Sequence, residues 1–154
     1  MAGNDSVLMM DLRAHPPRRS SDSLAGFIWL PRLLDKVRAF QAGTLGAYAY
    51  PSMLDRSYMR LFGFTPAFIE QAVREQQSDV VIATSIQTHI GLTDDEIFAL
   101  SRRFHRTYRV ALHMLDRDDG YASGIGYPLP RFLQTPVWRW YQRWAARKAS
   151  ADAV

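Results

Sequence analysis

Three glycines in the sequence each follow a segment whose apolar residues recur at helical spacing. Gly43, Gly63 and Gly91 come directly after these segments. Glycine adopts the left-handed conformation that closes a helix without a steric penalty, so it marks the residue after a helix end. Helices with one apolar stripe must pack together to bury it. The pattern predicts an all-α, or nearly all-α, fold in the form of a compact bundle of five or six helices.

Helix-start signals place the other boundaries. Proline suits the first helical position, where its missing N–H would have no partner. Thr93 and Glu96 form a capping box, in which each satisfies a backbone donor of the other. The expected helices cover residues 30–42, 53–62, 65–77, 78–91, 93–115 and 136–150. Around Tyr48–Tyr50 an alternating pattern before a proline predicts either one short extended segment or none.

The chain has 154 residues, which fits a single domain. Proline, arginine and serine near the start predict a flexible N-terminal arm over residues 1–20, followed by one helical domain over residues 21–150. No stretch approaches 18 apolar residues and the start is not basic, so we expect a cytoplasmic protein without a transmembrane segment.

Composition excludes several classes of site. The chain has no cysteine, which rules out disulfides, thiolate nucleophiles and cysteine-bound zinc. Its four histidines show no metal-binding spacing, and no cofactor motif or nucleophile elbow is present. We therefore expect neither a metal nor a cofactor. The net charge of +4 permits anionic partners without demanding them.

Three cations surround one carboxylate on the expected helix 30–42. Arg32 and Arg38 each lie three positions from Asp35, so either could pair with it. The remaining positive charge beside a glycine-rich turn could hold a carboxylate or phosphate through bidentate arginine contacts. The alternative is a solvated helix face with ordinary ion pairs. The candidate ligand-binding residues are Arg32, Asp35, Lys36, Arg38, Tyr48 and Tyr50.

This cluster leads to a hypothesis of a non-enzymatic binding or interaction protein with an anion-binding niche and a small anionic ligand. The alternative is a small enzyme that acts on an acidic or phosphorylated metabolite, with Asp35 or Asp55 as the base. A helix-turn-helix DNA-binding protein is less favoured, because the would-be recognition helix opens with three acidic residues that repel phosphates. We therefore do not expect nucleic-acid binding.

The expected last helix interleaves aromatic and basic residues. Such a helix either docks on its own domain, mediates contact with a partner protein or a second copy, or lies on a membrane or nucleic acid. Its residues are Trp138, Arg139, Trp140, Tyr141, Arg143, Trp144 and Arg147.

One stretch of the sequence resembles a known family. It reads Trp-Leu-Pro-Arg-x-x-Asp-Lys-x-Arg-Ala from Trp29, followed by Ala-Gly-Thr-Leu-Gly-x-Tyr-x-Tyr up to Tyr50. This pattern is similar to that of the uncharacterised bacterial DUF5069 family, and a weaker similarity extends over about residues 20–110. The resemblance implies a bacterial origin and no particular chemistry.

Overall fold

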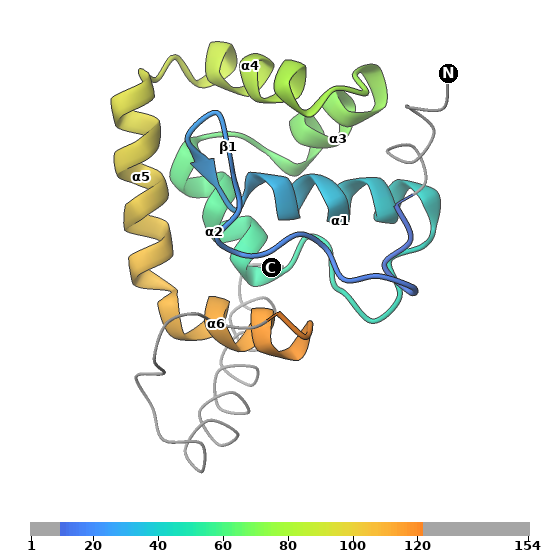
Figure 1. The fold of residues 1–154 in the computed structure, drawn as a ribbon. Coiled ribbons are helices and arrows are strands. Elements are labelled where there is room, and N and C mark those ends of the chain that lie inside the picture. The colour runs from blue at the N-terminus through green and yellow to red at the C-terminus, as the bar shows by residue number, and fades with distance from the viewer. Residues whose placement is uncertain (1–9, 122–154) are drawn as a thin grey trace, which may run out of the picture. The chain divides into compact units, whose positions relative to one another are not determined.

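The structure is a computed structural model that describes residues 10–121 of the chain. The chain divides into two compact units, Met1–Thr107 and Tyr108–Val154. The described part is mostly helical, as the sequence predicts (Figure 1). Its elements are β1 (Ser23–Leu24), β2 (Phe27–Ile28), α1 (Leu30–Ala42), α2 (Met53–Phe62), α3 (Pro66–Glu75), α4 (Asp79–Ile90) and α5 (Asp94–Thr107) in the first unit, and α6 (Arg109–Asp118) in the second.

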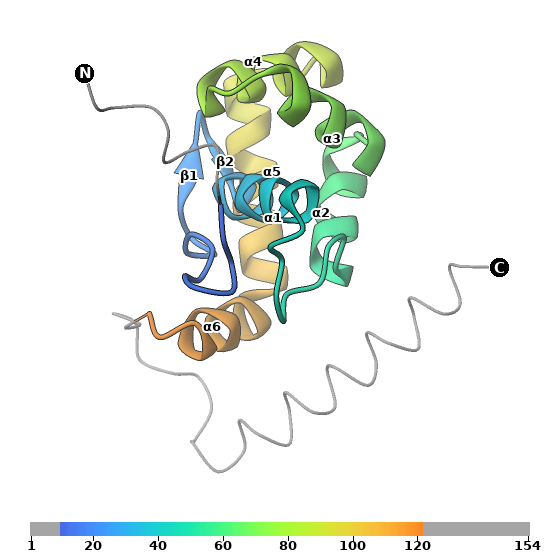
Figure 2. The same cartoon turned by 90° about the vertical axis from the view of Figure 1, so that its right-hand side faces the viewer.

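Helix α1 lies at the centre of the first unit, with the hairpin, α2, α3 and α5 around it (Figure 2). Its bounds follow from local signals, since Pro31 lies in the first turn and Gly43 closes the helix at φ 70°. Every residue from Leu30 to Ala39 is buried, including four charged ones. A solvated helix face, the alternative that the sequence left open, is therefore wrong for α1.

The two short strands form a hairpin ahead of α1. They pair antiparallel, with Ser23 opposite Ile28 and Leu24 opposite Phe27. The connecting residues Ala25 and Gly26 both have positive φ, which is the geometry of a tight two-residue hairpin turn. The stretch around Tyr48–Tyr50 contains no strand, so of the two readings of that stretch the structure has the irregular one.

Aromatic side chains form the core next to the hairpin. The ring of Tyr58 on α2 lies 4.7 Å from that of Phe62 and 5.1 Å from that of Phe104 on α5. Trp29 completes the cluster, with its ring 5.8 Å from Phe104. The hydroxyl of Tyr58 is fully buried and has no hydrogen-bond partner within residues 10–121. Burial raises the pKa of this tyrosine well above its ordinary value.

The helix expected over residues 93–115 is divided in the structure. Helix α5 ends at Thr107, Tyr108 leaves the helical conformation at φ −103° and ψ 14°, and α6 then runs on to Asp118. The prediction of one continuous helix was wrong because this part of the sequence holds no glycine or proline that would mark the break. The last helix, expected over 136–150, lies outside the described residues.

The expected N-terminal arm is described from residue 10. Leu12 is buried, and its N–H donates to the carbonyl of Thr44 at 3.0 Å. The hydroxyl of Thr44 donates to the carbonyl of Met10 at 2.6 Å. These bonds hold residues 10–12 against the turn after α1. The mobility expected for residues 1–20 and the single domain expected over residues 21–150 stay predictions.

Among the described residues, none of the helices is long and apolar enough to cross a membrane.

Candidate functional site

The charged residues of α1 are buried in the structure. Arg32 and Asp35 are each 1% exposed, Lys36 is 4% exposed and Arg38 is 9% exposed. A buried charge is costly unless it is paired and hydrogen-bonded. The question is therefore which groups reach these four side chains.

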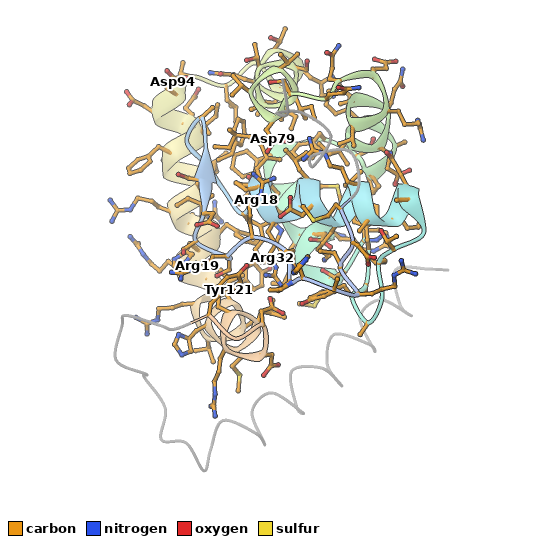
Figure 3. The ribbon with its side chains drawn as sticks, turned by 45° about the vertical axis from the view of Figure 1, so that its right-hand side comes forward. Arg18, Arg19, Arg32, Asp79, Asp94 and Tyr121 are labelled. Carbon is orange, nitrogen blue, oxygen red and sulfur yellow. The ribbon has the colours of Figure 1, made fainter. Side chains whose placement is uncertain are left out.

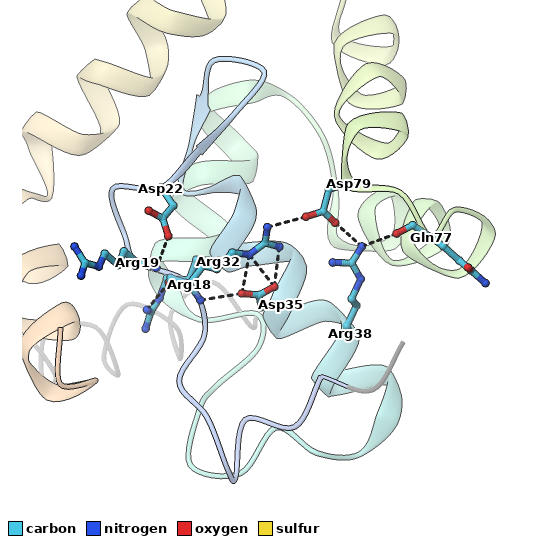
Figure 4. Close-up of polar contacts among 8 residues, drawn as sticks. All are labelled: Arg18, Arg19, Asp22, Arg32, Asp35, Arg38, Gln77 and Asp79. Atoms are coloured by element: carbon cyan, nitrogen blue, oxygen red, sulfur yellow. Dashed lines mark hydrogen bonds and ion pairs between the residues drawn. The ribbon is translucent and has the colours of Figure 1, made fainter. Parts of the chain in front are cut away.

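Asp35 is held by an arginine from the N-terminal segment. Arg18 donates to its carboxylate through the backbone N–H at 2.8 Å and through Nη2 at 2.7 Å, with Nε 3.0 and 3.1 Å from the two oxygens (Figure 4). Nη1 of the same guanidinium donates to Asp79 at 2.7 Å. Burial alone lowers the pKa of Arg18, but the hydrogen bonds to both carboxylates outweigh it, so the pKa is raised. The pairing of Asp35 with Arg32 or Arg38, which helical spacing favours, is not formed.

Asp79, the first residue of α4, joins Arg18 to Arg38. Nη2 of Arg38 donates to Asp79 at 2.5 Å and to the backbone carbonyl of Gln77 at 3.2 Å. Burial raises the pKa of Asp79, but the hydrogen bonds from Arg38 and Arg18 outweigh this effect, and the pKa is lowered. Hydrogen bonds therefore link four side chains in the order Asp35, Arg18, Asp79 and Arg38, as Figure 4 shows.

Lys36 pairs with a carboxylate that also caps a helix. Its ammonium donates to Asp55 and, at 3.2 Å, to the hydroxyl of Ser52. Ser52 and Asp55 form the capping box of α2, in which Asp55 accepts from the Ser52 N–H at 2.8 Å. The indole N–H of Trp29 donates to the other oxygen of Asp55 at 3.2 Å. Both oxygens of this fully buried carboxylate are therefore engaged.

Arg32 contacts aromatic rings and the N-terminal segment. Its guanidinium carbon lies 5.4 Å from the centre of the Trp29 ring and 5.9 Å from that of Tyr48, within the range of a cation–π contact. Its Nη1 donates to the carbonyl of Arg18 at 3.0 Å. Arg18 and Arg32 lie near each other at α1 in Figure 3. The structure thus brings Arg32 and Tyr48 together, as the predicted niche requires.

Tyr50 takes a different place. Its hydroxyl donates to Glu70 on α3 at 3.2 Å, and its ring lies 5.2 Å from that of Phe40. Burial, with the negative charge of Glu70, raises its pKa well above the ordinary value. Tyr50 therefore packs between α1 and α3, and does not face the charged side chains of α1.

Three carboxylates neutralise most of the positive charge around α1. Asp35, Asp55 and Asp79 accept from Arg18, Lys36 and Arg38. The sequence singled out Asp35 and Asp55, but it gave no sign of Arg18 or Asp79. Arg18 lies 17 positions from Asp35 and 61 from Asp79, so no local spacing could have linked them.

A depression opens where α1 and α3 end side by side. It has a volume of about 290 Å³. Both hydrogen bonds of Arg38 use Nη2, so Nε and Nη1 make no hydrogen bond within the described part of the chain. Arg74, in the last turn of α3, adds a second cation. The lining residues are Arg38, Gln41, Ala42, Val73, Arg74, Gln76 and Gln77.

Residues 10–121 contain no group of three or more histidine, aspartate or glutamate side chains that could hold a metal ion. The charged donors around α1 are arginine and lysine side chains that ion pairs with carboxylates hold in fixed positions.

No curated protein matches the chain. The model of a family described as "Domain of unknown function (DUF5069)" matches residues 14–114, about two thirds of the chain. The match includes the whole of the hydrogen-bonded network around α1 and the depression beside it. On this match the chain belongs to the DUF5069 family.

Proposed function

We propose that the protein is a non-enzymatic binding protein for a small anion, and that the anion binds in the depression between α1 and α3. The observation that carries the proposal is the hydrogen bonding of Arg38, which among the described residues uses only one of the three nitrogens of its guanidinium. Asp79 and Gln77 hold its guanidinium through Nη2, while Nε and Nη1 stay available on a side chain that lines the depression. Nε and Nη1 point to different edges of the guanidinium plane, and each can still donate to an oxygen of a carboxylate or phosphate.

The local charge favours an anion. Asp79 is the carboxylate nearest to Arg38, and it divides its charge between Arg38 and Arg18. Arg74 is exposed at the rim and has no ion pair within residues 10–121. Glutamine amides on the lining can supply neutral donors. A volume near 290 Å³ lies at the small end of ligand pockets, which suits inorganic phosphate or a small carboxylate.

The proposed site differs from the niche that the sequence predicted. Of the six candidate residues, only Arg38 lines the depression. Asp35 contributes through Arg18 and Asp79, which fix the guanidinium of Arg38. Pre-positioning a side chain in this way removes the entropy cost of ordering it when a ligand binds. The other four candidates hold neighbouring parts of the fold and make no contact with this depression.

The carboxylates offered as catalytic bases are poorly placed for proton transfer. Asp35 is 1% exposed and Asp55 is fully buried, and the oxygens of both accept hydrogen bonds from cations. A general base must reach the proton it removes, either directly or through one water. Ser52 is equally engaged, because its hydroxyl oxygen accepts from Lys36 and from the Asp55 N–H. These contacts support binding without catalysis. Bacterial origin and a cytoplasmic location stay predictions.

The test is a titration with inorganic phosphate followed by isothermal calorimetry and thermal unfolding, at an ionic strength held constant with chloride. We expect saturable binding and a rise in Tm. Arg74→Gln removes one cation from the exposed rim without touching the buried network, so it should weaken binding several-fold. Arg56→Gln removes an exposed arginine from α2, outside the depression, and is the matched control.

Two results would count against this function. One is the absence of any saturable response to phosphate and, in a parallel titration, to succinate. The other is an equal loss of binding in Arg74→Gln and Arg56→Gln, which would show that only the overall charge matters.

A further inference from the structure

The outward face of α5 carries a stripe of exposed side chains that the anion site does not use. Ile97, Ser101 and Phe104 are buried on the opposite face of this helix. Its members are three or four positions apart, except for one adjacent pair, so they share one face of the helix. The stripe consists of Asp95, Phe98, Ala99, Arg102 and Arg106.

The stripe changes sign along its length. It begins with Asp95 in the first turn and ends with Arg106 in the last, and Phe98, at 52% exposure, lies between them. The guanidinium of Arg102 lies 5.6 Å from the centre of the Phe98 ring. Neither Asp95 nor Arg106 forms a salt bridge with any described residue. A large exposed aromatic between two unpaired opposite charges is typical of a contact surface.

We infer that this face of α5 binds the same face of a second copy of the chain, with the two helices antiparallel. In an antiparallel pair related by a two-fold axis, the acidic end of each helix meets the basic end of the other. With the axis beside Leu100, Phe98 of each copy lies opposite Arg102 of the other. Asp95 then lies level with the last turn of the other helix, where Arg106 points to the same side.

The like charges near the axis are tolerable in this register. The two Arg102 residues are four residue steps apart along the axis, about 6 Å at the rise of an α-helix. Each guanidinium also lies over an aromatic ring, which attracts a cation. The paired ends contribute two opposite-charge contacts, while the centre contributes cation–π contacts and the burial of both Phe98 rings.

A second copy fits the stripe better than a nucleic acid does. A polyanion would favour Arg102 and Arg106 but would be repelled by Asp95 at the other end of the same stripe. Asp94 at the same end of α5 lies at the outer edge in Figure 3 and adds to that repulsion. Only a partner whose charge runs in the opposite direction satisfies both ends, and an antiparallel copy does so by symmetry.

The size of the surface sets the strength of the contact. One face of a 14-residue helix buries less than the roughly 1,200 Å² of a standard interface, so the dimer is weak and forms only at high protein concentration. Its charged ends make the association sensitive to salt. This inference does not depend on the proposed anion site, because α5 does not line the depression.

The test uses sedimentation velocity of the full chain over a range of concentrations, at low and high salt. We expect a monomer–dimer equilibrium that weakens as salt rises. Asp95→Arg alone brings two positive ends together, and Arg106→Asp alone brings two negative ends together, so each variant should be monomeric. A mixture of the two variants should dimerise, because every end contact in the heterodimer again joins opposite charges.

Controls separate the contact from a general effect of charge or of folding. Arg56→Asp makes the same change in net charge as Arg106→Asp, but on α2, and should dimerise like the wild type. Phe98→Ala removes only an exposed side chain, and it should weaken dimerisation several-fold with an unchanged circular dichroism spectrum. This variant serves as the test if a charge variant fails to fold.

Several outcomes would overturn the inference. They are a wild-type protein that stays monomeric at all concentrations, a mixture of folded charge variants that stays monomeric, and a Phe98→Ala variant that dimerises like the wild type. Salt-sensitive binding of a DNA duplex by the monomer, in place of self-association, would also overturn it.

Discussion

Replacing Lys36 by methionine tests whether the buried ion pair holds α1 to α2. Methionine has a similar length and keeps the apolar part of the side chain, but it leaves Asp55 without its cation. Asp55 is fully buried and retains the hydrogen bonds from Trp29 and Ser52. Removing one partner of a buried pair costs about 3–5 kcal/mol, because the remaining charge is no longer compensated.

That loss is large compared with the stability of a typical domain, about 5–15 kcal/mol. With a urea dependence of about 2 kcal/mol per molar, the midpoint of unfolding should fall by roughly 2 M. Urea unfolding followed by far-ultraviolet circular dichroism measures this shift. The control Arg56→Met removes an exposed cation from α2 and should change stability by no more than about 0.5 kcal/mol.

A second substitution shows whether the uncompensated charge is the cause. In the Lys36→Met background, Asp55→Asn replaces a buried carboxylate by a neutral amide, whose single oxygen can still accept from either Ser52 or Trp29. It should recover part of the lost stability, whereas the same change in the wild type should destabilise. If Asp55→Asn destabilises both backgrounds equally, the pair is not coupled and the reasoning is refuted.

Two further predictions concern Asp79 and Tyr58. Asp79 has a lowered pKa in the folded protein, so its contribution to stability is present above the unfolded-state pKa and is lost as the pH falls through the lower folded value. Asp79→Asn should therefore destabilise the protein at neutral pH and reduce the loss of stability on acidification below about pH 4. Urea unfolding at a series of pH values measures both effects. A variant that loses as much stability on acidification as the wild type would contradict this prediction. The hydroxyl of Tyr58 is buried without a hydrogen-bond partner, so Tyr58→Phe should leave stability unchanged or raise it by about 1 kcal/mol in urea unfolding, and a clear loss would show that the hydroxyl has a partner.

Local signals in the sequence were enough to predict several helix boundaries. The expected bounds of residues 30–42 and 53–62 agree with α1 and α2. Gly43 and Gly63 follow these helices directly and close them in the left-handed conformation, so their ends could be predicted from local sequence. The hairpin at residues 23–28 was missed, since two-residue strands are too short to show an alternating pattern. The break at Tyr108 was missed because no helix-breaking residue accompanies it.

Long-range pairing explains why the site could be predicted only in part. The sequence pattern pointed to the charged residues of α1, but helical spacing predicted that they would pair with one another. That rule holds for a helix surface exposed to water. Because α1 is buried along most of its length, Asp35 takes Arg18 from the N-terminal segment and Arg38 takes Asp79 from α4. Tertiary packing, which spacing along one helix cannot reveal, decides these pairs.

The most direct measurement of the anion site is the nuclear magnetic resonance signal of the Nε–H group of Arg38, assigned by its loss in Arg38→Lys. Titration with inorganic phosphate at constant ionic strength should shift this signal along a saturable curve, whereas the Nε–H signal of the matched exposed residue Arg56 stays in place. A signal of Arg38 that does not move, or that moves no more than that of Arg56, would contradict anion binding between α1 and α3.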